Sequence, residues 1–314
     1  MKDIKNILIC GIGAVGSIYA DKIQNFSSTN LRVLVDKYRL EKYTKNPIIF
    51  NGNELHFNYV LPEETDFKAD LIIIATKFSG LEEACRNIKN FVKDDSIIIS
   101  LLNGVTSEEI LAETYGWEKV LLAYFIGHSA IREGRNITHD NVNTIVFGAK
   151  DNSIVSENVK RVKVFFDKAG INYKIPIDMR YSLWLKFMLN VAANQPTAIL
   201  RMTFGEMLEN EKFMEFAVNI MQEVQQIAKA EGVNNTEDMI EKTVEHLKTM
   251  LPEGKTSMLQ DVEAGRKTEV DMFAGTIVKL GKKHGIETPY NKIMKEMIEI
   301  IHNHQNLSSQ VLKV

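Results

Sequence analysis

The chain has 314 residues, 45% of them hydrophobic and 25% charged, with a formal net charge of −3 at pH 7. This length favours two domains, and the near-neutral charge creates no field that would attract nucleic acid or an anionic membrane. Only two cysteines occur, and no segment approaches the roughly 20 apolar residues of a membrane span, so we expect a cytoplasmic protein without disulfides or a signal peptide.

In the first half of the chain, short apolar runs alternate with helical patterns. The run 71–75 is apolar throughout, as in strands buried on both faces of a parallel sheet. Strands are predicted at 7–10, 32–35, 71–75, 96–100 and 119–123, and helices at 14–24, 80–91 and 107–115. Residues 124–150 and 171–175 are expected to add antiparallel strands at one edge. The alternation predicts an α/β domain, a doubly wound Rossmann-type sheet, over residues 1–176.

After Pro176 the pattern becomes helical, with apolar residues that recur at helical spacing. Helices are predicted at 179–200, 205–231, 235–249, 257–284 and 289–303, separated by proline and glycine residues. The 13 methionines of the chain are interpreted as core packing. A mostly α-helical domain is therefore predicted over residues 177–314.

The first predicted strand leads into a glycine-rich turn that opens the first predicted helix. In such a turn the first glycine permits a tight bend, the second lets backbone N–H groups approach a pyrophosphate, and the third lets the helix pack close to the strand. An acid about 20 residues further along completes the dinucleotide fingerprint. A dinucleotide site is therefore favoured over a merely structural bend, with the residues Gly11, Ile12, Gly13, Ala14, Val15 and Gly16.

Lys186, Asn190 and Asn194 are spaced four residues apart, so on a helix they lie on nearly one face. Their neighbours are almost all apolar, and a buried polar group without a partner costs about 1–3 kcal/mol. The stripe could be the solvated face of an amphipathic helix, but such faces usually carry many charges. We therefore expect a polar ligand to bind to this stripe in a cleft between the domains.

A second polar group spans Ser257 and Glu269, twelve residues apart, a little over three turns if the segment is helical. Taken alone, Ser257 would be a helix N-cap and Glu269 a surface carboxylate. Beside a nicotinamide site, however, a Lys, a Glu, a Ser and several Asn residues favour reduction of a carbonyl. Hydride attack builds negative charge on the carbonyl oxygen, and a positioned ammonium can stabilise that charge and deliver the proton.

Four further motifs accompany the glycine turn. They are a Thr-Lys pair at 76–77, a Leu-x-Asn-Gly element at 101–104, a Lys-x3-Asn-x3-Asn helix at 186–194, and a Ser-Met-x-Gln-Asp segment that ends in Thr-Glu at 257–269. Together they resemble the ketopantoate reductase family over nearly the full chain. The resemblance implies that Lys186 is the proton donor and that Glu269 lies by Lys186 and the nicotinamide. It implies substrate contacts from Asn103, Asn190, Asn194 and Ser257, and cofactor contacts from the turn, Thr76, Lys77, Asn103, Glu269 and the backbone near Ala130. We also expect a homodimer and no metal.

Three positions depart from the family pattern. Asp36 stands where members that use NADPH usually carry an arginine, and a carboxylate there accepts hydrogen bonds from a ribose 2′-hydroxyl and repels a 2′-phosphate. NAD is therefore the expected cofactor, while Lys37 and Arg39 leave NADP open. Phe204 and Gly254 replace polar substrate contacts, and Gly254 would leave room for a bulky tail. These replacements favour an apolar tail near Phe204, as in the D-2-hydroxyacid dehydrogenases of the family, among them D-mandelate dehydrogenase.

Three functions are compared on this basis. The first is hydride transfer between NAD and a 2-oxo acid or D-2-hydroxy acid with a branched or aromatic tail. The alternative is reduction of 2-dehydropantoate to D-pantoate in pantothenate biosynthesis. The third, a dinucleotide sensor without turnover, predicts a degraded catalytic set, whereas Lys186, Asn190, Asn194, Ser257 and Glu269 are all present.

Overall fold

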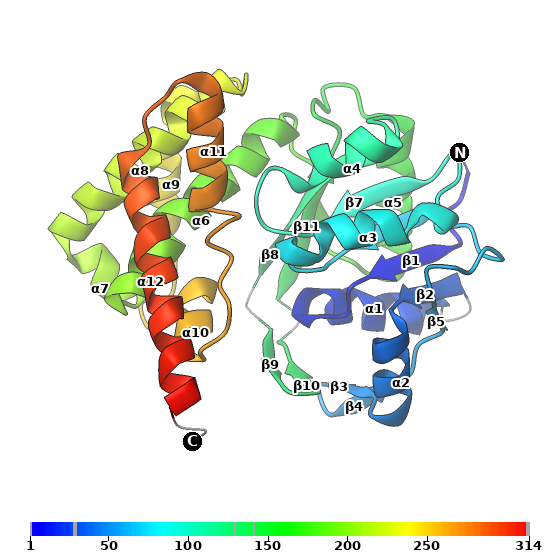
Figure 1. Ribbon diagram of the computed structural model, residues 1–314. Coiled ribbons are helices and arrows are strands. Elements are labelled where there is room, and N and C mark those ends of the chain that lie inside the picture. The colour runs from blue at the N-terminus through cyan, green and yellow to red at the C-terminus, as the bar shows by residue number, and fades with distance from the viewer. Residues whose placement is uncertain (1, 28–29, 128–129, 141, 312–314) are drawn as a thin grey trace. The chain divides into compact units, whose positions relative to one another are not determined.

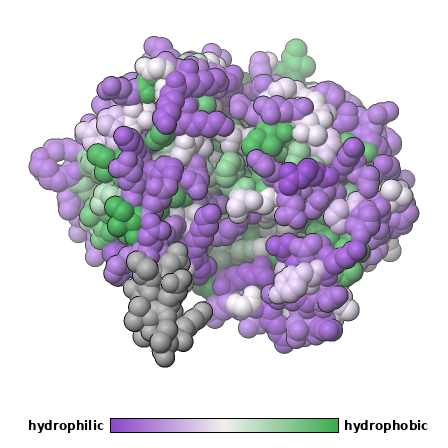
Figure 2. All heavy atoms as spheres, in the orientation of Figure 1, coloured by the Kyte–Doolittle hydropathy of each residue, from purple (hydrophilic) through white to green (hydrophobic). Residues whose placement is uncertain are grey.

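The apolar runs of the first half form mainly parallel strands and the patterns of the second half form helices, so the expected α/β domain followed by a helical domain is confirmed (Figure 1). The computed structural model describes residues 2–27, 30–127, 130–140 and 142–311, and the chain divides into two units, Met1–Arg180 and Tyr181–Val314. In Figure 2 the visible surface is mainly hydrophilic. None of the described helices has the length and apolar character needed to cross a membrane.

Within the described residues, the main sheet of the first unit has the strand order β12-β11-β8-β7-β6-β1-β2-β5. Its strands are β1 (Ile7–Cys10), β2 (Leu31–Leu34), β5 (Tyr59–Val60), β6 (Leu71–Ile74), β7 (Ile97–Ser100), β8 (Val120–Gly127), β11 (Asn143–Gly148) and β12 (Tyr173–Lys174). Neighbouring strands are parallel except for β8 and β11. That antiparallel pair confirms the addition expected within residues 124–150.

The last strand of this sheet runs in the direction that was expected. β12 pairs in parallel with β11, which is itself antiparallel to β8, so both strands run antiparallel to the rest of the sheet and the addition expected at 171–175 is confirmed. A helix that was not predicted, α5 (Glu157–Ala169), connects the two strands. A crossover helix returns the chain to the end of the sheet at which β11 began, and β12 is therefore parallel to β11.

A second, four-stranded sheet was not predicted. Its order within the described residues is β4-β3-β10-β9, from β3 (Ile48–Phe50), β4 (Asn53–Leu55), β9 (Ile131–Glu133) and β10 (Asn136–Thr138). Each strand has three residues, too few for an alternating pattern to be recognised. The parallel pairing of β3 with β10 joins segments that are far apart in the chain.

Helices cover both faces of the main sheet. Ile7 and Ile9 of β1 pack in one core cluster with residues of α1 (Ala14–Ser27) and α5. Leu8 and Cys10 point to the other face, where they pack with α3 (Leu81–Asn87) and α4 (Ser107–Tyr115). Short 3₁₀ turns, η2 (Phe78–Gly80) and η3 (Lys89–Phe91), flank α3, so the helix predicted at 80–91 is divided.

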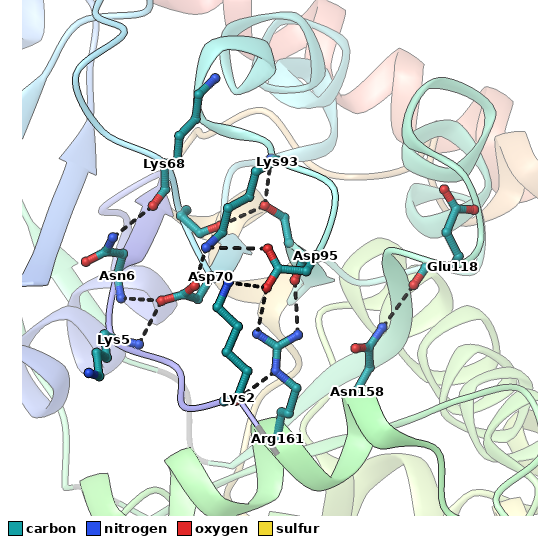
Figure 3. A network of polar contacts seen from close by, with 12 residues as sticks. Lys2, Lys5, Asn6, Lys68, Asp70, Lys93, Asp95, Glu118, Asn158 and Arg161 are labelled. Atoms are coloured by element: carbon teal, nitrogen blue, oxygen red, sulfur yellow. Dashed lines mark hydrogen bonds and ion pairs between the residues drawn. The ribbon is translucent and has the colours of Figure 1, made fainter.

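A polar network ties the chain together at the edge where the parallel strands begin (Figure 3). The Asp70 carboxylate, before β6, accepts a hydrogen bond from the backbone N–H of Asn6 at 2.9 Å and pairs with Lys93. From α5, the buried Arg161 donates to the carbonyl oxygen of Asp95 at 3.0 Å. These contacts join the segment before β1, the starts of β6 and β7, and α5. We interpret this edge as structural, which leaves the opposite edge for a ligand.

The second unit is helical, but two of its predicted helices are broken. Its helices are α6 (Met179–Leu200), α7 (Phe204–Glu209), α8 (Glu211–Ala230), η4 (Thr236–Asp238), α9 (Met239–Leu247), α10 (Ser257–Glu263), α11 (Ala274–His284) and α12 (Pro289–Val311). The segment 205–231 breaks at Asn210, whose side chain caps α8. The segment 257–284 breaks after α10, where Gly265 has a φ of +65° that ends a helix.

Buried polar side chains hold the starts of three of these helices. Asn194 of α6 accepts a hydrogen bond from the backbone of α10, and Gln195 accepts one from Ala274 N at the start of α11, at 3.0 Å. The buried carboxylate of Glu223 on α8 accepts 2.7 and 3.0 Å hydrogen bonds from Tyr290 N and Asn291 N at the start of α12. The first N–H groups of a helix have no intrahelical partner, so these side chains stabilise the arrangement of the helices.

Candidate active site

Three glycines shape the turn between β1 and α1. Gly11 has a φ of +98°, and a Cβ built on it would lie 2.7 Å from the carbonyl oxygen of Ala75. A Cβ on Gly16 would lie 1.9 Å from the carbonyl oxygen of Gly11. Beside Gly13, in contrast, a Cβ would meet no described atom within 4 Å. The turn therefore needs glycine at both ends and leaves the middle of its backbone open, a shape that fits a dinucleotide's pyrophosphate.

The remaining residues of the turn prepare the start of α1. Ala14 and Val15 lie in the first turn of the helix, where N–H groups have no carbonyl partner within the helix. The Ile12 side chain is buried in the core, and its carbonyl oxygen accepts a hydrogen bond from the hydroxyl of Ser17 at 3.3 Å. The start of α1 thus offers N–H donors and the positive end of a helix dipole to an anion.

Asp36, Thr76, Lys77 and Asn103 follow the carboxyl ends of β2, β6 and β7. In the strand register, Cys10 is level with Leu34 and with Ile74. Ile74 is in turn level with Ser100. The four residues therefore lie along the same edge of the sheet as the glycine turn, the edge at which ligands bind in open α/β sheets.

Asp36 is the N-cap of α2 (Lys37–Lys45), where its carboxylate accepts a hydrogen bond from Arg39 N at 2.6 Å. The same carboxylate forms an ion pair with the Arg39 guanidinium. Lys37 pairs with Glu63 at 3.6 Å. Lys37 and Arg39, the two cations that could have bound the 2′-phosphate of NADP, thus each have an acidic partner in the protein.

Thr76 and Ala130, two further residues expected to contact the cofactor, also lie in the first unit. The hydroxyl oxygen of Thr76 is buried and has no hydrogen-bond partner in the described part of the chain. Ala130 directly precedes β9, from which the Arg132 guanidinium donates a 3.1 Å hydrogen bond to the carbonyl oxygen of Ile12. The segment with Ala130 is thereby brought to the glycine turn. Arg132 was not singled out from the sequence, because nothing local marks a contact over 120 residues.

In the second unit, Lys186 lies half-buried on α6. Its ammonium forms no hydrogen bond or ion pair with any of the described residues. Burial lowers the pKa of Lys186 from 10.5 to about 8. A lysine with a pKa near neutrality can both stabilise a developing oxyanion and release its proton.

One turn and two turns further along α6, Asn190 and Asn194 are buried. The side-chain oxygen of Asn194 accepts hydrogen bonds from Ser257 Oγ at 3.1 Å and from Met258 N at 3.3 Å, and its nitrogen donates to the carbonyl oxygen of Asn190 at 3.1 Å. Asn194 therefore has hydrogen-bond partners within the protein, and its expected contact with a ligand stays a prediction. The side-chain nitrogen of Asn190 makes no hydrogen bond to a described residue and stays available.

Ser257 is exposed at the first position of α10, but it is not the N-cap. That position belongs to Thr256, whose hydroxyl accepts a hydrogen bond from Leu259 N at 3.2 Å. Ser257 is free of the capping role and is oriented by its hydrogen bond to Asn194.

Phe204 and Gly254 contact each other. The backbone N–H of Phe204 donates to the carbonyl oxygen of Gly254 at 3.0 Å. A Cβ on Gly254 would lie 3.0 Å from Cδ2 of the Phe204 ring. The expectation that Gly254 leaves room for a bulky tail is therefore wrong, because the ring already fills this space.

Glu269 does not lie on one helix with Ser257, since α10 ends at Glu263. Its backbone carbonyl accepts hydrogen bonds from Met272 N and Phe273 N at 3.0 and 3.1 Å. The adjacent Thr268 N–H donates to Nε2 of His302 at 3.3 Å. These bonds, rather than helical periodicity, position Glu269.

Two family models match the chain: "Ketopantoate reductase PanE/ApbA" over residues 7–152 and "Ketopantoate reductase PanE/ApbA C terminal" over residues 178–302. Among curated relatives, the 2-dehydropantoate 2-reductase of Aquifex aeolicus (strain VF5) is 29% identical, over 94% of this chain and 96% of its own length.

Two solved structures show the same fold. D-mandelate dehydrogenase in a ternary complex with NADH and anilino(oxo)acetate has a TM-score of 0.82 at 23% identity, covering 96% of this chain and 99% of its own. A dimeric ketopantoate reductase from Staphylococcus aureus has a TM-score of 0.74 at 21% identity, with the same coverage of 96% and 99%. At these identities the likeness concerns the fold alone.

Proposed function

We propose that this chain reduces a 2-oxo acid to the D-2-hydroxy acid. The chain belongs to the ketopantoate reductase family of NAD(P)-dependent oxidoreductases, and the proposal proceeds from that membership. The observation that carries the proposal is the half-buried Lys186 ammonium, which has no partner among the described residues and a pKa lowered to about 8. Such a group is suited to donate a proton to a ketone oxygen during reduction.

In the proposed mechanism, negative charge collects on the ketone oxygen as hydride reaches the carbonyl carbon, and Lys186 stabilises this charge and then protonates it. Asn190 contributes its unpaired amide nitrogen to the substrate, and Ser257 its hydroxyl. Asn194 acts on the substrate mainly through its hydrogen bond to Ser257. Glu269 is proposed to lie by Lys186 and the nicotinamide.

The dinucleotide would supply the hydride when bound. We propose that the glycine turn holds its pyrophosphate and that Thr76, Lys77, Asn103 and the backbone near Ala130 hold the remainder. NADH is the proposed preference over NADPH. The ion pairs of Lys37 with Glu63 and of Arg39 with Asp36 support it, because neither cation is free to meet a 2′-phosphate.

The first proposed substrate is 2-dehydropantoate, which gives D-pantoate. The name of the Aquifex aeolicus relative supports this choice over the 2-oxo acid with a branched or aromatic tail that the sequence alone favoured. The contact between Phe204 and Gly254 supports it too, since one of the two arguments for a bulky tail no longer holds.

The second candidate is a 2-oxo acid with a branched or aromatic tail, as in D-mandelate dehydrogenases. One observation favours it: the Phe204 ring is only half-buried, so part of an apolar surface remains for a substrate. An aromatic tail could pack against this ring, and a hydroxylated tail would find no hydrogen-bonding group on it.

A steady-state panel of 2-dehydropantoate, 2-oxoisovalerate and phenylglyoxylate, each with NADH and with NADPH, tests these proposals. We expect 2-dehydropantoate with NADH to have the highest kcat/KM. A clear preference for phenylglyoxylate would transfer the assignment to the second candidate. Absence of turnover for all three acids would contradict the proposed reaction.

We also propose a cytoplasmic homodimer. The related ketopantoate reductase of Staphylococcus aureus is described as dimeric. On α12, Ile293, Met297 and Ile300 are 50%, 38% and 65% exposed, and their spacing places them on one helix face. An exposed apolar stripe of this kind is suited to packing against a second copy of the chain.

A further inference from the structure

Arg132 links the small sheet of the first unit to the glycine turn. Its Nη1 donates to the carbonyl oxygen of Ile12 at 3.1 Å, and its Nε donates to the carbonyl oxygen of Gly134 at 3.2 Å. In the described part of the chain, Arg132 forms no ion pair with a carboxylate, and its Nη2 makes no hydrogen bond. The guanidinium charge beside the turn is therefore not neutralised by the protein.

The hydrogen bond to Ile12 orients one peptide group of the turn. No cis peptide bond occurs among the described residues, so the C=O of Ile12 and the N–H of Gly13 point in opposite directions. Arg132 and the Ser17 hydroxyl both donate to the Ile12 oxygen. The N–H of Gly13 is thus held pointing away from both donors, and no described residue accepts it.

A diphosphate fits this combination. The start of α1 carries the positive end of the helix dipole, and Arg132 adds a full positive charge next to it. The charge of Arg132 therefore adds to the backbone dipoles that favour the two negative charges of a pyrophosphate.

We propose that Arg132 is a positioning residue for the pyrophosphate of the dinucleotide: it fixes the Ile12–Gly13 peptide and supplies positive charge beside the glycine turn. This inference rests on the proposed function, because it assumes that the turn holds a dinucleotide. It assigns to the small sheet, which carries Arg132 on β9, a role in cofactor binding.

The test compares two nucleotides in calorimetric titrations of the full-length protein: ADP-ribose, which has a pyrophosphate, and AMP, which does not. Arg132→Gln should raise the Kd of ADP-ribose at least tenfold and that of AMP less than threefold. Arg132→Lys retains the charge but not the planar donor group, so its Kd should be intermediate. Arg135→Gln is the matched control, because Arg135 lies in the same hairpin but pairs with Glu54 at 3.5 Å; it should bind like the wild type.

Wild-type affinity of Arg132→Gln for ADP-ribose would overturn the inference, as would an equal loss for AMP, which indicates a general defect. If Arg132→Gln does not fold, Arg132→Lys decides: unchanged ADP-ribose binding overturns the inference, and a selective loss supports it. A wild-type protein that binds neither nucleotide would instead contradict the proposed function. In kinetics, the selective effect should appear as a higher KM for NADH with an unchanged kcat.

Discussion

Lys186 is the residue whose surroundings make the most specific prediction. Replacing it with alanine removes the proposed proton donor, so kcat should fall by roughly 10²–10⁴, the usual contribution of a positioned acid–base group. The Kd for NADH, measured by fluorescence titration, should change little because the glycine turn belongs to the other unit. If Lys186→Ala retained most of its turnover, the proton would have to come from Glu269 or from water.

The lowered pKa of Lys186 also predicts a pH dependence. Reduction requires the protonated amine, which predominates below its pKa of about 8. The kcat/KM for reduction should therefore be level below this pH and fall as the pH rises above it. Arg132 variants serve as controls that keep this profile, whereas Lys186→Arg should remove the decline, since arginine stays protonated, at a lower overall rate. A profile without a decline up to pH 10 would contradict the role of Lys186.

At Asp36, one carboxylate both caps α2 and holds the Arg39 guanidinium. Asp36→Ala removes the negative charge and releases Arg39 toward a 2′-phosphate. The ratio of kcat/KM for NADH to that for NADPH should therefore fall at least tenfold. Glu63→Gln, which releases only Lys37, should change the ratio less than threefold. A wild type that prefers NADPH would refute this account of Asp36.

Among the secondary-structure elements, the contact between α4 and β8 contains a buried acid. Glu108 of α4 accepts hydrogen bonds from Ala123 N at 3.2 Å and from the hydroxyl of Ser107 at 2.8 Å, and burial raises its pKa from 4.5 to about 7. The folded state thus binds this proton more tightly than the unfolded state. The protonated Glu108 side chain therefore contributes about 3 kcal/mol to the free energy of unfolding below about pH 4.5. This contribution is lost as the pH rises through 7.

Glutamine at position 108 can accept from Ala123 N and donate to Ser107, without a titrating proton. Between pH 5 and pH 8, the free energy of unfolding of Glu108→Gln should therefore rise relative to that of the wild type. Urea unfolding at the two pH values measures the difference. Glu113→Gln, at an exposed position of the same helix, should show no such relative change. Equal pH dependence in Glu108→Gln and wild type would show that Glu108 is already ionised in the fold.

For the whole molecule, the apolar stripe on α12 predicts self-association. A homodimer has twice the 35.7 kDa mass of the chain, which sedimentation velocity can resolve. Ile300→Glu places a charge on the stripe and should shift the equilibrium toward monomer, because burying an unpaired carboxylate is costly. Ile154→Glu is the control, since Ile154 is 86% exposed and belongs to the other unit. A monomeric wild type would contradict the proposal.

The sequence alone was sufficient for features that depend on neighbouring residues. Gly11 to Gly16 follow a buried strand and open a helix, and the conformation required at Gly11 is local. The stripe of Lys186, Asn190 and Asn194 follows from helical periodicity, and α6 has the predicted bounds. Strand β1 also has its predicted bounds, because its residues are buried on both faces.

The tertiary structure decided what depends on residues far apart in the chain. Asn194 is satisfied by α10, Phe204 fills the space at Gly254, and Arg132 reaches Ile12 across 120 residues. No periodicity or motif reports such contacts, since each depends on how separate elements pack. The break at Gly265, in contrast, was missed although its signal is local, because a glycine with a positive φ just past a helix is a common helix end. Local chemistry therefore determined the elements and the candidate residues, and packing determined which of these residues are left free to meet a ligand.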